Sequence, residues 1–159
     1  MRRRAEREGI AVARRPLAAL DLPSLWKLIE NVQRRHATTG AHVPDLLQRA
    51  ASVLDEDLHL LVAHQSSQPI GCAVLVRSQD ELLGKWLGLD YERAWNTAAY
   101  YMLLAESVAL AIALGVRHLR LGASAYATKQ QFGVVSDERV NAVVVPAPLR
   151  LFANLGRAA

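Results

Sequence analysis

The sequence predicts an α/β fold in which a mixed, mainly antiparallel central sheet is flanked by helices within a single domain. Three observations predict this fold. Two helical patterns precede the centre of the chain, three consecutive apolar runs separated by polar turns form the centre, and a long apolar helix is followed directly by another strand-like run. A length of 159 residues suits one such domain.

The first elements are expected to be a short strand and a pair of helices. Apolar residues recur at helical spacing after Pro23, and Pro44 opens a second such pattern. The expected order is a strand at residues 10–14, a helix from Pro23 capped by Asp21 or Leu22, a loop at 36–43 and a helix from Pro44 to about Val53.

The centre is expected to be a three-stranded meander that leads into a strand–helix–strand unit. Its strands are predicted at residues 58–63, 70–76 and 82–89, with turns at 65–69 and 79–80. A long helix over 97–114 is expected to end at Gly115, because glycine readily adopts the left-handed conformation. The remaining predictions are a strand at 116–121, a helix at 124–131, a strand at 139–145 and a terminal helix at 149–155. In such a sheet the crevice lies beyond the strand ends, near the start of the long helix.

The positive charge is concentrated at the N-terminus. Residues 1–15 carry six arginines and two glutamates, whereas the rest of the chain has thirteen basic and thirteen acidic residues. We therefore divide the chain into a basic arm, residues 1–15, expected to be solvated and partly disordered, and a domain over residues 16–159. Since no aromatic residue is interleaved with these arginines to stack on bases, nucleic acid is not an expected partner.

Cysteine usage and the apolar helix exclude other classes of protein. The single cysteine, Cys72, lies in an apolar run and is expected in the core, so neither a disulfide within the chain nor a thiolate zinc site is expected, and no metal site is predicted. Residues 98–114 are apolar for about the minimum length of a membrane span, but Glu106 and Ser107 lie in the centre. No signal peptide is evident, and a cytoplasmic protein without a membrane segment is expected.

The segment from Asp90 to Thr97 is a candidate anion-binding site. A helix start offers backbone N–H groups and the positive end of the helix dipole, which suit a pyrophosphate. Asn96 or Thr97 can cap this helix, and Arg93 adds a cation. The alternative is an ordinary capped helix with an exposed arginine. Neither a Walker sequence nor Gly-x-Gly-x-x-Gly is present, which argues against phosphate-loop nucleotidases and dinucleotide-binding folds of that type.

A second candidate segment follows the strand that ends at Leu121. Gly122 allows a sharp turn into a helix, which places Ser124, Tyr126 and Lys129 in its first turn and a half. Tyr126 and Lys129 are three residues apart and share a helix face. A tyrosine beside a cation is suited to delivering a proton to a leaving group. The alternative is that Tyr126 packs and Lys129 is a solvated surface charge.

The stretch from Gly88 to Gly133 contains several short motifs in a characteristic order. They are Gly88-Leu89-Asp90-Tyr91, then Asn96-Thr97 followed by Tyr100-Tyr101, then Ala113-Leu114-Gly115-Val116, Leu121-Gly122, and Tyr126-x-x-Lys129-x-x-x-Gly133. The run from Leu82 to Gly133 thereby resembles the C-terminal lobe of FemAB-like and BioF2-like acetyltransferases, a branch of the GNAT superfamily. With the upstream helices and hairpin, the likeness extends over about residues 17–145. Two features depart from the family: the glutamine/arginine-x-x-glycine-x-glycine/alanine loop of standard GNAT enzymes has no counterpart, and FemAB-like proteins usually carry two such lobes.

The resemblance implies a GNAT-like fold and transfer of an acyl group from acetyl-CoA or another acyl-CoA to an amine or hydroxyl acceptor, a small molecule or a peptide. It places Arg93, Asn96 and Thr97 on the pyrophosphate side of the coenzyme. Ser124 and Lys129 would contact its pantetheine end, where Tyr126 would act catalytically. A homodimer would supply the missing second lobe; otherwise the chain is a fragment or a degenerate half.

An amine acceptor must lose a proton before it attacks, so a general base is expected. Asp90 is the first candidate because it follows the third strand into the crevice. Glu106 is the second, because burial in the apolar helix would raise its pKa, although it could equally be paired and structural. Further candidates are Glu81, His59 and His118. Positioning, and stabilisation of an oxyanion by a strand N–H, would contribute much of the rate.

Two other classes of function stay open at this point. One is a non-catalytic GNAT-like lobe that serves as a scaffold or a ligand-binding module. The other is a Fem-type transferase that uses aminoacyl-tRNA, for which the arginines of residues 1–15 would anchor phosphates.

Overall fold

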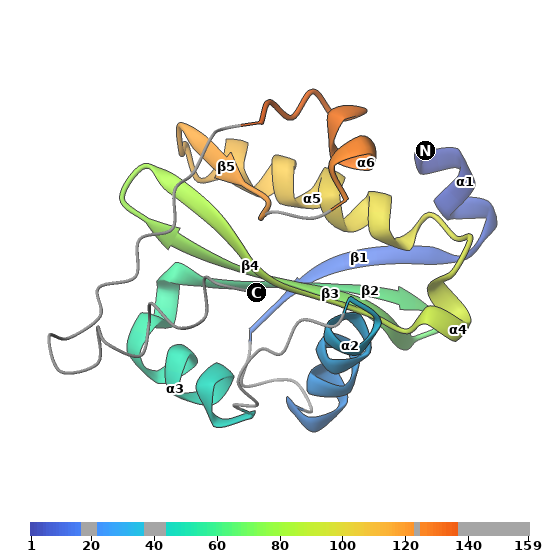
Figure 1. Cartoon of the computed structure of the whole chain (residues 1–159), viewed down its shortest axis with the longest axis horizontal. Helices are drawn as coiled ribbons and strands as arrows, with labels where there is room; N and C mark the ends of the chain where they lie inside the picture. Colours follow the sequence, from blue (N-terminus) through green and yellow to red (C-terminus); the bar gives the residue numbers. More distant parts are fainter. Residues whose placement is uncertain (17–21, 37–43, 123–124, 137–159) are drawn as a thin grey trace, which may run out of the picture. The chain divides into compact units, whose positions relative to one another are not determined.

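The computed structural model describes residues 1–16, 22–36, 44–122 and 125–136 and divides into two compact units, residues 1–122 and 123–159 (Figure 1). The elements of the first unit are α1 (Arg2–Arg7), β1 (Ile10–Arg15), α2 (Leu22–Arg35), α3 (Pro44–Leu54), β2 (Leu58–Gln65), β3 (Gln68–Ser78), β4 (Glu81–Leu89), α4 (Tyr91–Ala94), α5 (Ala99–Ala113) and β5 (His118–Arg120). A short helix, α6 (Tyr126–Gln130), belongs to the second unit.

The sheet confirms the predicted mixed topology. Its order is β1-β2-β3-β4-β5, and the first four strands are antiparallel to their neighbours. β5 runs parallel to β4, because α5 carries the chain back to the end of the sheet at which β4 begins. The predicted meander and the strand–helix–strand unit are both present.

Helices cover both faces of the sheet in the first unit (Figure 1). Alternate residues of β2 enter two different apolar clusters: Leu61 and Ala63 pack with α5, whereas Leu60 and Val62 pack with α2 and α3. This period of two follows from the pleat of a strand, which points successive side chains to opposite faces. The central strands therefore read as continuous apolar runs, which is typical of strands covered on both sides.

The N-terminal segment differs from the expected arm. Residues 2–7 form α1, and residues 10–15 form the edge strand β1, which pairs with β2 from Ile10↔Gln65 to Arg15↔Leu60. The physical reason is burial, because Ala5 and Ile10 are 1% and 6% exposed within the core cluster that contains α5. The arginines of this segment thus belong to a helix and a strand that are part of the fold.

The β2–β3 turn is tighter than predicted. The sequence indicated a polar turn over residues 65–69, but β2 runs to Gln65 and β3 starts at Gln68. Only Ser66 and Ser67 form the turn, and both have positive φ angles, 49° and 69°. Two-residue loops of this kind match the right-handed twist of paired strands, so the ladder continues up to the turn.

The long helix ends where the glycine predicted. Gly115 has a φ of +65°, and its N–H donates to the Ile112 carbonyl oxygen, while Val116 N–H donates to that of Ala111. At the other end the helix starts at Ala99, two residues later than predicted. Within the described ranges, no helix is long and apolar enough to cross a membrane, and no cluster of metal-binding side chains occurs.

Three predicted elements cannot be compared with the structure. The loop at 37–43, the strand at 139–145 and the helix at 149–155 lie outside the described residues. The predicted helix near residues 124–131 corresponds to α6, which is followed by Gly133 with a φ of +76°. Cys72 is fully buried, as predicted, and burial raises the pKa of its thiol to about 12, which makes it a poor nucleophile.

Candidate functional site

Strand β4 is much longer than the strand that pairs with it at the edge of the sheet. β5 pairs with β4 over three positions only, from Glu81↔His118 to Leu83↔Arg120, where β5 ends, and β4 continues to Leu89. Among the described residues, no strand pairs with this edge of β4 beyond Leu83. On its other edge, β4 pairs with β3 through a register shift that places Gly84 opposite Leu75 and Trp86 opposite Val74. A bulge of this kind bends a strand, and it lies just beyond the last position at which β4 pairs with β5.

The start of α5 lies beyond the end of β4 and already holds an anionic oxygen. The Ala98 N–H donates to Oε2 of Glu8 over 2.7 Å, and the Ala99 N–H donates to the Thr97 hydroxyl over 3.2 Å. The first amides of a helix have no acceptor inside the helix and favour negative charge. The N-cap position is Ala98, one residue after the predicted cap Thr97, whose hydroxyl accepts from the Ala99 N–H, and the role of Glu8 was not anticipated.

Asn96 does not cap the helix with its side chain in the way that the sequence suggested. Its backbone has a φ of +61°, and its carbonyl oxygen accepts from the guanidinium of Arg4. Arg4 also donates from Nε to Oε1 of Glu8 over 2.7 Å. Helix α1 is thus fixed to the start of α5 by a short chain of polar contacts.

Glu8→Gln is expected to lower the free energy of unfolding by about 1 kcal/mol near neutral pH, because it removes a charged cap from α5. The hydrogen bond from Arg4, followed by that from the Ala98 amide, holds the pKa of Glu8 below its usual value. A lowered pKa stabilises the fold above the unfolded-state pKa, and this contribution is lost as the pH falls through the folded-state pKa. Urea unfolding of wild type and variant should therefore differ at pH 7 and converge on acidification.

The exposed carboxylate Glu6, on the same helix, provides the matched control for this experiment. Glu6→Gln should leave both the stability at pH 7 and its pH dependence close to wild type. An equal loss in the two variants would contradict the capping role of Glu8.

Asp90 and Arg93 are both engaged in local structure. Oδ1 of Asp90 accepts from the backbone N–H groups of Glu92 and Arg93, over 3.1 and 3.3 Å, and thereby caps α4. Oδ2 of Asp90 lies 3.7 Å from Nε of Arg93, whose guanidinium also donates to the side chain of Gln68. This geometry favours a structural role for Asp90 over the role of general base. Arg93 belongs to α4, in the segment that precedes α5, and 55% of its side chain is exposed.

The burial expected for Glu106 is wrong. Its side chain is 31% exposed and lies 3.8 Å from Nη2 of Arg2. The apolar helix exposes this position because α5 buries only its sheet-facing side, where Ser107 donates to the Leu103 carbonyl oxygen. Glu106 is therefore a half-buried carboxylate beside an arginine, which agrees with the structural alternative.

The remaining candidate general bases lie in three different environments. Glu81 accepts from Nε and pairs with Nη2 of Arg120, at 2.7 and 2.6 Å, and His118 is exposed at the start of β5. His59 is 2% exposed, and its Nδ1 lies 2.8 Å from Nη2 of Arg14. Since a guanidinium only donates, the proton of this ring lies on Nε2. Burial, reinforced by the charge of Arg14, lowers the pKa of His59 and keeps it neutral.

The predicted residues of the second unit are described only in part. Tyr126 is the first residue of α6, and Ser124 lies outside the described residues. Lys129 is 4% exposed, so it is not the solvated surface charge of the alternative interpretation. Burial lowers the pKa of Lys129. The predicted crevice combines residues of both units, and it stays a prediction.

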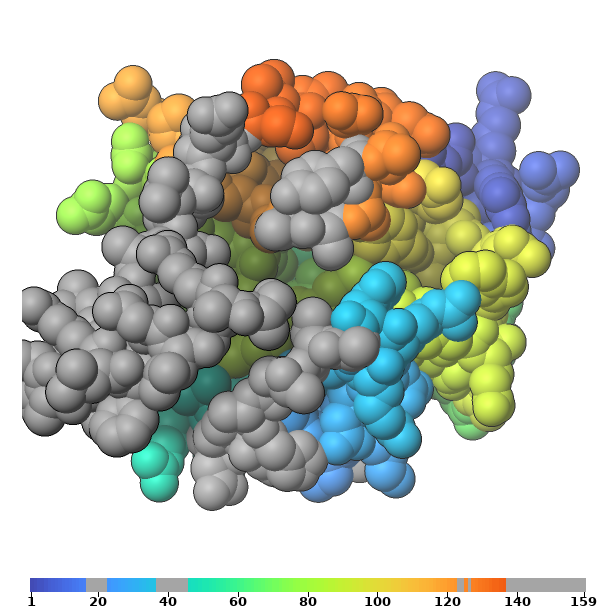
Figure 2. Space-filling view, viewed as in Figure 1, coloured from blue at the N-terminus to red at the C-terminus, as the bar shows by residue number. Residues whose placement is uncertain are grey.

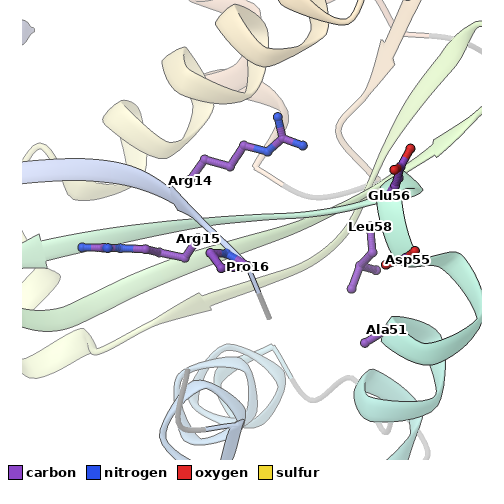
Figure 3. Close-up of a pocket in the computed structure, with 7 residues that line it drawn as sticks. All are labelled: Arg14, Arg15, Pro16, Ala51, Asp55, Glu56 and Leu58. Carbon is purple, nitrogen blue, oxygen red and sulfur yellow. The ribbon is translucent and has the colours of Figure 1, made fainter. Parts of the chain in front are cut away.

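A cavity of about 520 Å³ lies at the far end of β1 from the start of α5 (Figure 3). Its lining residues are Arg14, Arg15, Pro16, Ala51, Asp55, Glu56 and Leu58. In Figure 3 the guanidinium groups of Arg14 and Arg15 point in different directions, as expected for successive residues of a strand. The charged groups therefore do not converge on one ligand position, and we do not assign the cavity to the active site.

The unpaired edge of β4 and the helix start that holds an anionic oxygen together define a candidate binding site for a ligand with amide and anionic groups. The family model described as an acetyltransferase (GNAT) domain matches residues 1–130, and the chain belongs to this family. A comparison with curated proteins found no match.

Solved structures show the same fold. A possible acetyltransferase from Clostridium difficile 630 has 13% identity and a TM-score of 0.65, with 87% of this chain and 99% of that chain covered. A GNAT family acetyltransferase from Brucella melitensis, solved in complex with acetyl-CoA, has 18% identity and a TM-score of 0.61, with coverages of 81% and 84%. An aminoglycoside acetyltransferase from an uncultured soil metagenomic sample, in complex with sisomicin, has 14% identity and a TM-score of 0.60, with coverages of 89% and 98%. At these identities the likeness concerns the fold.

Proposed function

We propose that this protein transfers an acetyl or other acyl group from acyl-CoA to an amine or hydroxyl acceptor. The observation that carries the proposal is the edge of β4 beyond Leu83, which no described strand pairs with, together with a helix start that attracts an anionic oxygen. An unpaired strand edge offers backbone amides and carbonyls, which suit the two amide groups of pantetheine. The helix start suits the pyrophosphate.

The residues of the first unit fit such a coenzyme by their chemistry. Glu8 places an anionic oxygen on the Ala98 N–H, and a phosphate oxygen would replace this carboxylate there, because two anions repel each other at one N–H. Arg93 would add a cation beside it, and Asn96 and Thr97 would shape the segment between α4 and α5. The coenzyme, when bound, would supply an activated thioester carbonyl.

The protein's own contribution would be positioning, charge stabilisation and proton transfer. Backbone N–H groups of β4 beyond Leu83 are candidates to stabilise the oxyanion. We propose that Tyr126 donates a proton to the departing sulfur and that Ser124 and Lys129 contact the pantetheine end. Because Asp90 is engaged as a cap and Glu106 lies beside an arginine, a water-mediated role is the form in which either would act as base.

We also propose the finer assignments made from the sequence. The order of motifs from Gly88 to Gly133 supports the FemAB-like branch, and a homodimer would supply the second lobe of that branch. We propose a cytoplasmic location and an amine acceptor of small size or on a peptide. The aminoglycoside complex of one structural neighbour makes sisomicin a reasonable first acceptor to test.

Acetyl-CoA is expected to raise the melting temperature by about 9 °C at a concentration near 100 times its Kd, because it binds only the folded state. Thermal unfolding with increasing acetyl-CoA measures the shift, and native mass spectrometry reports bound coenzyme and subunit number together. An unchanged melting temperature at millimolar acetyl-CoA would favour the scaffold function.

The tRNA-dependent alternative has its own test. Salt-sensitive binding of aminoacyl-tRNA that is lost when Arg2, Arg3 and Arg7 are replaced by glutamine would favour it. Substitution is preferable to removal of residues 1–15, because that removal would also delete the edge strand β1.

A further inference from the structure

The end of α2 and the segment around α4 lie side by side on the face shown in Figure 2. There the guanidinium carbon of Arg35 lies 4.5 Å from the ring centroid of Tyr91 and 4.4 Å from that of Trp95. The two ring centroids are 6.1 Å apart, and the planes are tilted by 53°. We call these three residues the arginine clamp.

The guanidinium carbon lies within cation–π distance of both rings, which restrict its orientation, and the exposed side chain leaves N–H groups for a ligand. A guanidinium over an aromatic face is attracted by the ring quadrupole, and its planar fork is then preorganised. Both Arg35 and Trp95 are exposed, the latter by 56%. Among the residues that the structure describes, Arg35 forms no ion pair with a carboxylate, whereas its neighbour Arg34 lies 3.8 Å from Glu30.

The arginine clamp lies next to the proposed coenzyme site along the chain. Tyr91 and Trp95 belong to the segment that connects β4 to α5, and the Ala98 amide at its end holds the carboxylate of Glu8. A ligand whose pyrophosphate lies at the start of α5 would extend its nucleotide end over this segment. At its nucleotide end, coenzyme A carries a phosphomonoester on the 3′ position of the ribose.

We propose that Arg35 binds the 3′-phosphate of coenzyme A, with Tyr91 and Trp95 as positioning residues that orient the guanidinium. This inference rests on the proposed function. A phosphomonoester carries close to two negative charges at neutral pH, and a guanidinium binds two of its oxygens with two parallel hydrogen bonds. A lysine would provide charge without this planar fork.

The test compares coenzyme A with 3′-dephospho-coenzyme A by isothermal titration calorimetry. Wild type should bind coenzyme A about 10-fold more tightly than the dephospho form, as expected for one charge-assisted bidentate contact. Arg35→Gln should weaken coenzyme A by about 10-fold and leave the dephospho form unchanged. Arg35→Lys should retain only part of the preference.

Arg34→Gln is the matched control, since Arg34 is 72% exposed on the same helix turn and pairs with Glu30. The Arg34→Gln variant should keep the full preference for coenzyme A over 3′-dephospho-coenzyme A. Equal affinities of wild type for the two ligands, or equal losses for both in Arg35→Gln, would overturn the role of Arg35 and leave the proposed function standing. If wild type binds neither ligand, the coenzyme assignment itself fails, and this inference fails with it.

Discussion

Gly88→Ala is expected to lower the free energy of unfolding by about 3 kcal/mol, which corresponds to a decrease of roughly 10 °C in the melting temperature. A Cβ at this position of β4 would lie 2.8 Å from the Ile29 nitrogen, 2.8 Å from the Leu28 carbonyl carbon and 2.7 Å from Sγ of Cys72. Two of these atoms are backbone atoms of α2, which cannot move without displacing the helix. Urea unfolding monitored by circular dichroism measures the loss.

Gly71→Ala, on the neighbouring strand β3, is the matched control. Its Cβ would meet the methyl ends of Leu89 and Leu103 at 3.0 and 3.1 Å, and flexible side chains can adjust by that much. Gly71→Ala should therefore lower the free energy of unfolding clearly less than Gly88→Ala does. Adding Cys72→Ala to Gly88→Ala removes the sulfur contact alone and should not restore stability. Full rescue by that second change would contradict the close approach of α2 as the cause.

The strands and helices could be predicted because the residue patterns that indicate them are local in the sequence. Consecutive apolar runs gave β2, β3 and β4, and Gly115 marked the end of α5. The strand at residues 10–14 was predicted and is present as β1, but residues 1–9 were misjudged as a solvated arm, because charge is a property of composition whereas the fold is decided by which side chains are buried. Among six arginines, Ala5 and Ile10 supply the apolar contacts that dock α1 and β1 on the core.

The candidate site was predictable in place but not in detail. The long helix starts two residues later than predicted, and the Thr97 hydroxyl just before it accepts from the Ala99 N–H, because the first turn of a helix needs acceptors for its amides. Glu8 and Ala98 are ninety residues apart, and Arg35 and Trp95 are also far apart in sequence. No local pattern predicts such pairs, since they depend on how β1 and α2 are placed against the sheet.

Tyr126→Phe is expected to reduce kcat by about 100-fold and to change the affinity for acetyl-CoA by less than about twofold. The reason is that general acid catalysis contributes roughly two to four orders of magnitude, whereas the phenol hydroxyl is not expected to bind the ground-state thioester strongly. Release of free thiol from acetyl-CoA, measured with a panel of amines that includes sisomicin, gives kcat. Calorimetry with acetyl-CoA gives the affinity.

Tyr101→Phe is the matched control for this experiment, because it removes a phenol hydroxyl from α5, where Tyr101 packs edge-on against Tyr100. Its turnover should stay near that of wild type. Unchanged turnover in Tyr126→Phe would remove Tyr126 from the mechanism, whereas equal losses of kcat and affinity would assign it to binding. Either of these two results would leave positioning and charge stabilisation by β4 as the main sources of the rate.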